Sequence, residues 1–81
     1  KIPTTEEVVK KRLTRVINPV AGLDVVKTGL IKELRIREGE VTVSVGLPAD
    51  HQFANNIRSE IIERIEPLWD VKRVTVTFTG V

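Results

Sequence analysis

The chain has 81 residues, enough for one small domain whose folding buries roughly 60–65% of the surface of the extended chain. Its 41% hydrophobic and 30% charged residues indicate a globular protein rather than a disordered one. Thirteen basic and eleven acidic residues give a net charge of +2, which is too small an excess to indicate a nucleic-acid partner. The lack of cysteine excludes disulfides, thiolate catalysis and zinc–sulfur sites in these residues. Without a long apolar run or a leader pattern, we expect a cytoplasmic protein with no membrane partner.

The first predicted element is an amphipathic helix that begins near Thr4 and ends at Asn18-Pro19. Thr4 and Glu7 have the spacing of a capping box, with Thr4 as the N-cap, and a residue before proline avoids helical geometry. The apolar stripe has helical spacing: Val9, Leu13, Val16 and Val20. Oppositely charged residues four apart are expected to pair: Glu6 with Lys10, and Glu7 with Lys11. Residues 10–12 then form a solvated basic face.

The next two elements predict a β-hairpin, with strands at residues 30–37 and 40–47 around a short turn at Glu38-Gly39. The second strand alternates cleanly between two faces. One face is apolar: Val41, Val43, Val45 and Leu47. The other face is small or polar: Thr42, Ser44 and Gly46. The hairpin should therefore be buried on one face only.

A second helix and a final strand complete the pattern. Asp50 is the expected N-cap, Pro67 ends the helix, and Glu60 can pair with Arg64. The helical stripe is regular: Ala54, Ile57, Ile61, Ile65 and Leu68. Residues 71–79 alternate as a strand with one apolar face. Trp69 is expected at the edge of the core, with an exposed interface position as the alternative.

The order α-β-β-α-β with one apolar face on every strand predicts an α+β fold. We expect a two-layer α/β sandwich, in which both helices cover one face of a three-stranded mixed sheet. The connection from the second strand through the helix to the third should be a right-handed crossover. The opposite sheet face, rich in Thr, Ser and Arg, should be exposed. The order of the strands in the sheet stays open.

Few residues suggest chemistry, and the strongest candidates are Asp24, Asp50 and His51. An Asp–His pair can bind a metal or move a proton, but a metal site needs three or four converging ligands and His51 is the only histidine. A capping Asp50 beside an exposed His51 is therefore the favoured interpretation. Asp24 would join them only if the long loop at residues 17–31 folds over the start of the second helix. Gly22 and Gly29 are expected to permit positive φ angles in that loop.

The chain resembles the metal–sulfur cluster assembly domain, which occurs alone in SufT- and PaaD-type proteins and at the N-terminus of Mrp/ApbC-type P-loop ATPases. Four segments carry the resemblance: Leu23-Asp24-Val25-Val26, Thr28-Gly29-Leu30-Ile31-Lys32, Pro48-Ala49-Asp50-His51 and the strand from Val71. The chain departs from the family pattern at two places. Ile17-Asn18-Pro19-Val20 lacks both carboxylates of the Asp-Pro-Glu turn, and Asp50 or His51 replaces the cysteine.

The resemblance implies iron–sulfur cluster assembly or transfer, with this chain as the N-terminal domain of a longer protein. Iron–sulfur clusters are held mainly by cysteine sulfur, so a domain without cysteine should not ligate one. We therefore expect no cofactor and no metal here, with a cluster and ATP belonging to the full-length protein. The expected role is non-catalytic binding of apo-protein clients or assembly factors, with homodimerisation left to the full-length protein. The expected contact residues are Asn18, Pro19, Asp24, Thr28, Asp50 and His51.

Three other functions remain open. A stand-alone assembly adaptor would have no ATPase domain downstream. A KH-like nucleic-acid module would need a G-x-x-G loop, and residues 48–67 contain no glycine. A small enzyme would need paired titratable groups in a pocket, and only Asp24, Asp50 and His51 could supply them.

Overall fold

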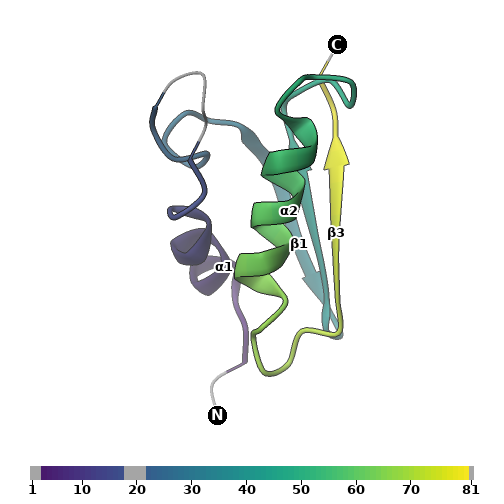
Figure 1. Cartoon of the computed structure of the whole chain (residues 1–81). Coiled ribbons are helices and arrows are strands. Elements are labelled where there is room, and N and C mark those ends of the chain that lie inside the picture. The colour runs from purple at the N-terminus through teal and green to yellow at the C-terminus, as the bar shows by residue number, and fades with distance from the viewer. Residues whose placement is uncertain (1–2, 18–21, 81) are drawn as a thin grey trace.

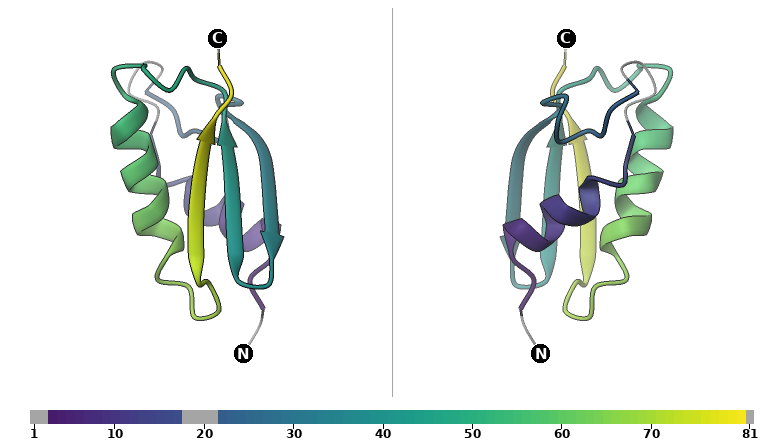
Figure 2. Two further views of the ribbon diagram at one scale, coloured as in Figure 1. Left: turned by 90° about the vertical axis from the view of Figure 1, so that its right-hand side faces the viewer. Right: turned by 90° about the vertical axis from the view of Figure 1, so that its left-hand side faces the viewer.

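The computed structural model describes residues 3–17 and 22–80. Its elements are α1 (Glu6–Leu13), β1 (Ile31–Arg37), β2 (Glu40–Val45), α2 (Ala54–Ile65) and β3 (Arg73–Phe78). The strand order is β1-β2-β3, and the central strand β2 is antiparallel to β1 and parallel to β3. Both helices cover the same face of the sheet (Figure 1, Figure 2). This confirms the predicted two-layer sandwich with a mixed sheet, and Figure 2 shows the right-handed crossover through α2.

A two-residue turn closes the hairpin between β1 and β2. Glu38 and Gly39 both have positive φ angles, 49° and 86°, and Arg37 pairs with Glu40 across the turn. Two positive φ angles are the mark of a type I′ turn, whose twist matches that of the flanking strands. The carbonyl of Gly39 also accepts a hydrogen bond of 2.7 Å from the Lys72 N–H. The hairpin is thereby tied to the segment that enters β3.

The core lies between the sheet and the helices. Ten of its apolar residues are almost completely buried: Val9, Leu13, Val16, Val25, Val41, Val43, Val45, Ile57, Ile61 and Ile65. Most were predicted from the helical stripes and the β2 alternation. Val25 is an addition from the loop before β1, where its N–H donates to the Val16 carbonyl at 2.9 Å. The loop is therefore pinned to the core.

The open face of the sheet is polar, as expected, except that Ser44 is buried. Ser44 lies on the central strand, and its hydroxyl is 2.9 Å from the hydroxyl of Thr77 on β3. Neighbouring strands on both sides cover a small side chain at this position. Thr75 and Thr77 remain exposed.

Both helices begin later than predicted. The N-cap of α1 is Thr5, whose hydroxyl accepts from the Val8 N–H at 3.4 Å, rather than Thr4. The N-cap of α2 is Phe53, without a side-chain hydrogen bond, so the assignment of Asp50 as a cap was wrong. Residues 49–53 form turns before α2 starts.

The end of α1 and the expected ion pairs also differ from the predictions. The helix stops at Leu13, because the chain tightens so that the Val16 N–H donates to the Leu13 carbonyl at 3.0 Å. Across the described ranges, the ion pairs are Arg35–Glu33 and Arg73–Glu40. The pairs expected along the helices are not formed. Neither helix in the described part of the chain is long and apolar enough to cross a bilayer.

Candidate functional site

Asp24 organises the loop that precedes β1. Its side chain is 8% exposed, and Oδ1 accepts hydrogen bonds from the backbone N–H groups of Val26 at 2.9 Å and Lys27 at 2.8 Å. An aspartate that accepts from the residues two and three positions on stabilises a turn in the manner of a helix cap. Asp24 also forms an isolated bridge with Ile17, which joins the two ends of the segment 18–23. Its carboxylate therefore has a clear structural role.

Thr28 and Gly29 complete the same turn. The Thr28 hydroxyl donates to the carbonyls of Asp24 at 3.1 Å and Val25 at 3.3 Å. Gly29 has a φ of 71°, as its sequence position predicted, and its N–H donates to the Val26 carbonyl at 3.1 Å. Asp24 and Thr28 thus fold one compact turn from opposite ends. The other two candidates from this loop, Asn18 and Pro19, lie outside the described residues.

Asp50 and His51 lie in the turn that leads into α2. The Nδ1 of His51 accepts the Phe53 N–H at 3.1 Å, and the two rings are 5.7 Å apart between centroids. The neutral imidazole is then assigned its proton on Nε2, because Nδ1 acts as the acceptor. His51 is half-buried and shapes the helix entry, whereas Asp50 is exposed. Asp50 is therefore the more accessible of the two for a partner.

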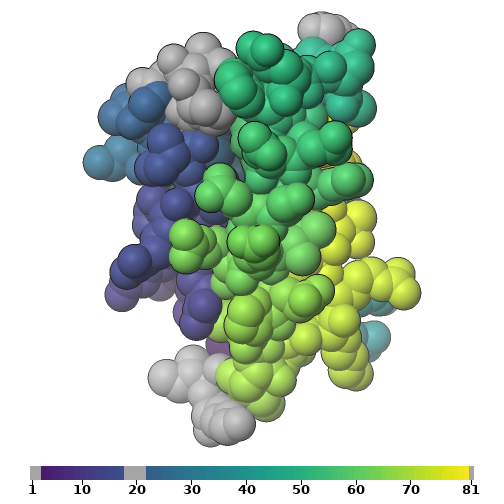
Figure 3. All heavy atoms as spheres, in the orientation of Figure 1, coloured from purple at the N-terminus to yellow at the C-terminus, as the bar shows by residue number. Residues whose placement is uncertain are grey.

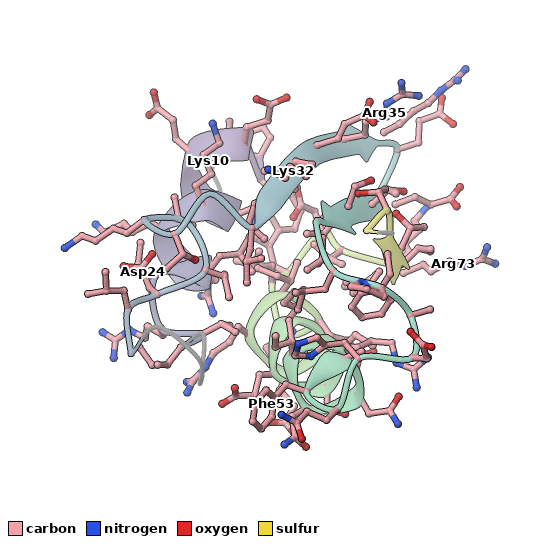
Figure 4. The ribbon with its side chains drawn as sticks, turned by 90° about the horizontal axis from the view of Figure 1, so that it is seen from above. Lys10, Asp24, Lys32, Arg35, Phe53 and Arg73 are labelled. Atoms are coloured by element: carbon pink, nitrogen blue, oxygen red, sulfur yellow. The ribbon has the colours of Figure 1, made fainter. Side chains whose placement is uncertain are left out.

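The loops around Asp24 and around His51 occupy the same end of the molecule, the upper end in Figure 1. Figure 4 looks onto this end and shows Asp24 and Phe53 well apart, on different segments. Within residues 3–17 and 22–80, no three His, Cys, Asp or Glu side chains are placed to hold a metal ion. The grouping of Asp24, Asp50 and His51 into one site, which the sequence suggested, is not formed as a metal centre. We call this end, made of residues 22–29 and 48–53, the loop end.

Two features were not found from the sequence. Thr4 donates hydrogen bonds to Asp70 from its hydroxyl, to Oδ1, and from its backbone N–H, to Oδ2 at 2.8 Å. These bonds, the hydroxyl one above all, hold the pKa of Asp70 below its ordinary value of 3.8. Trp69, expected at the edge of the core with an exposed position as the alternative, is 55% exposed in the connection between α2 and β3.

The second feature is a depression between the two helices. Its described lining residues include four cations: Lys11, Arg12, Arg15 and Arg64. The sequence showed the basic run at residues 10–12 but gave no reason to bring Arg64 beside it. Only the packing of α1 on α2 makes this combination visible. We call this depression the basic groove.

The comparisons with known proteins agree with this fold. The model of a family described as "Iron-sulfur cluster assembly protein" matches residues 6–78, which is nearly the whole chain. The chain belongs to this family. No curated protein sequence is significantly similar to it.

Among solved structures, this iron–sulfur assembly domain is similar to a crystal structure from Bacillus anthracis, titled as a domain of unknown function, DUF59. The TM-score is 0.78 at 19% sequence identity, and the match covers 91% of this chain and 73% of the other. At this level of identity the likeness establishes the fold, which is the fold expected from the sequence.

The residues of this family member do not fit an iron–sulfur cluster. Such clusters are held by cysteine thiolates, with histidine in some centres, and this chain has no cysteine and one histidine. The Nδ1 of that histidine is already used as an acceptor in the turn before α2. The side chains of this domain therefore do not supply the sulfur ligands that an iron–sulfur cluster needs.

Proposed function

We propose that this domain is a non-catalytic, partner-binding part of a cytoplasmic iron–sulfur cluster assembly or carrier protein of the Mrp/ApbC ATPase type. One observation carries the proposal: the chain is an iron–sulfur assembly domain without any cysteine. A cluster would then be held elsewhere in the protein, together with ATP. The role left for this domain is to contact apo-protein clients or other assembly factors.

The loop end is the proposed contact surface. Asp24 and Thr28 fix the shape of its first turn by hydrogen bonds, and His51 fixes the second turn. Preformed loops of this kind cost little ordering entropy on binding, which favours recognition of a partner. Asp50 offers an exposed carboxylate there. Asn18 and Pro19 belong to the proposed contact set on sequence grounds.

Anaerobic reconstitution of the isolated domain with ferrous iron and sulfide tests whether the cluster is held elsewhere in the protein. The protein should remain colourless after desalting and contain no stoichiometric iron, because it lacks thiolate ligands. A brown, stably metallated protein would overturn the proposal.

Cluster transfer by the full-length protein tests whether the loop end contacts partner proteins. Asp50→Lys should slow transfer to an apo-ferredoxin, while cluster loading and ATP hydrolysis stay unchanged. Glu66→Lys is the matched control, since it makes the same charge change on an exposed residue beyond the opposite end of α2. Equal transfer rates for both variants would contradict a contact at the loop end.

The reading frame beyond residue 81 distinguishes the proposed ATPase context from a stand-alone adaptor. A Walker A motif downstream supports the ATPase, because its glycine-rich loop and lysine bind the phosphates of ATP. A frame without such a motif favours the adaptor, which would use the same loop end.

A further inference from the structure

The basic groove follows the seam between α1 and the last turn of α2, on the helical side of the molecule that Figure 3 shows. It has a volume of about 660 Å³. Its described lining is Val8, Lys11, Arg12, Thr14, Arg15 and Arg64. All eleven Asp and Glu residues of the chain lie in the described part, and none of them lines the groove. Four cations therefore share one depression without an acidic neighbour in its wall.

Arg12 gives the groove a defined shape. Its Nη1 donates to the backbone carbonyl of Arg64 at 3.2 Å, which joins α1 to the C-terminal turn of α2. One such bond leaves most of the five guanidinium donors available. The ion pairs of the described residues lie on the sheet, at Arg35–Glu33 and Arg73–Glu40. Among the described residues, no carboxylate forms an ion pair with Lys11, Arg15 or Arg64.

The geometry points to a docking surface for an acidic segment of a partner protein at the basic groove. Arginine side chains bind carboxylates through two parallel hydrogen bonds, and three arginines and a lysine can engage several carboxylates at once. The volume is within the range of ligand sites, but the groove is open, and five of its six described lining residues are charged or polar, which suits side chains of a peptide. The surface is separate from the loop end, so this inference goes beyond the proposed function.

A nucleic acid fits the groove less well. Single-stranded nucleic acids bind basic grooves that also offer aromatic side chains for base stacking, and no described lining residue is aromatic. The whole chain has a net charge of only +2, so there is no extended positive field to follow a phosphate backbone. The groove itself offers one short cluster of four cations, which matches a short run of carboxylates.

Fluorescence anisotropy with a dye-labelled, glutamate-rich peptide tests the inference on the intact chain. The double variant Arg15→Gln and Arg64→Gln should weaken binding by about tenfold or more, since two charge-assisted contacts are lost. Arg12 is retained because it joins the helices. The control is Arg37→Gln with Arg58→Gln, which removes two exposed charges outside the groove and should change affinity by no more than about twofold.

Three results would overturn the inference. These are the absence of saturable binding by the peptide, equal weakening by both double variants, and tighter, groove-dependent binding of an RNA oligonucleotide of the same charge. The test is independent of the loop end, because Asp50→Lys should leave peptide binding unchanged even if cluster transfer fails. Backbone amide shifts confined to residues 8–15 and 64 on peptide addition would support the assigned surface.

Discussion

Thr4 donates hydrogen bonds to the carboxylate of Asp70 from both its hydroxyl and its backbone N–H, although 66 positions separate the two residues. Each oxygen of the carboxylate accepts one of these bonds. The contact connects the segment before α1 to the loop before β3, and so joins two parts of the chain that no strand pairing connects. It also explains why Thr4 does not cap α1.

Removing this contact should destabilise the domain. Asp70→Ala should lower the melting temperature, because both Thr4 donors lose their charged acceptor. Glu66→Ala is the control, since Glu66 is an exposed carboxylate at the C-cap of α2, four positions before Asp70. Hydrogen exchange should be faster at the Thr4 amide in the Asp70 variant alone. Equal melting temperatures for the two variants would contradict a stabilising role.

The Thr4–Asp70 contact also predicts that the stability of the domain depends on pH. The pKa of Asp70 is lower in the folded protein than its ordinary value of 3.8, chiefly because the Thr4 hydroxyl favours the charged form. A carboxyl group with a lowered folded pKa contributes stability above its unfolded pKa and loses it as the pH falls through the folded pKa. The melting-temperature difference between wild type and Asp70→Ala should be constant near neutral pH, shrink as the pH falls below 3.8 and disappear below the lowered folded pKa. A difference that persists there would contradict this account.

Asp24 should behave as the acceptor that closes its turn. Asp24→Ala should lower the free energy of unfolding by about 1–2 kcal/mol, as for a lost helix cap, because the Val26 and Lys27 N–H groups lose their acceptor. Asp24→Asn keeps an Oδ1 acceptor for the Val26 and Lys27 N–H groups and should retain most of the stability. Urea denaturation of the three proteins measures both effects. Equal losses for Ala and Asn would show that the charge, rather than the turn, is what matters.

Burial should decide the cost of deleting one methylene from an isoleucine. Ile61→Val removes atoms from a fully buried side chain of α2 and should cost about 0.5–1.5 kcal/mol of unfolding free energy. Ile17→Val makes the same chemical change at a residue that is 47% exposed, and its cost should be much smaller. Chemical denaturation of the two variants, analysed with the same dependence of unfolding free energy on denaturant concentration, measures both costs. Similar costs at both sites would contradict the assignment of the core.

Periodicity was enough to predict the layers of this fold. Burial sets whether each residue of an element is apolar or polar. It produces both the helical stripe of Ile57, Ile61 and Ile65 and the alternation along β2. Several such positions support one another, so the elements were found within a few residues. The hairpin turn was found because Gly39 marks it locally, and its type I′ geometry is known only from the structure.

Single polar contacts could not be predicted in the same way. Thr4 has the local pattern of an N-cap, but a distant Asp70 competes for its hydroxyl. Asp50 is a residue type that often caps helices, but it lies three positions before Phe53, the actual N-cap of α2. The basic groove depends on Arg64 meeting α1, which is a result of helix packing. The Thr4 and Arg64 contacts are each decided by one long-range neighbour, and a local sequence pattern does not contain that information.

The last described residue, Gly80, donates its N–H to the Leu47 carbonyl at 3.0 Å, so the chain leaves the sheet next to the turn that enters α2. A side-chain carbon at Gly80 would approach the Leu47 backbone to 2.4 Å, which explains the need for glycine there. A reporter or domain that follows this point starts next to the Leu47–Pro48 segment, so it needs a linker to leave Asp50 and His51 accessible to a partner. Affinity tags and surface immobilisation should therefore use the amino-terminal side, which Figure 1 places at the far end of the molecule.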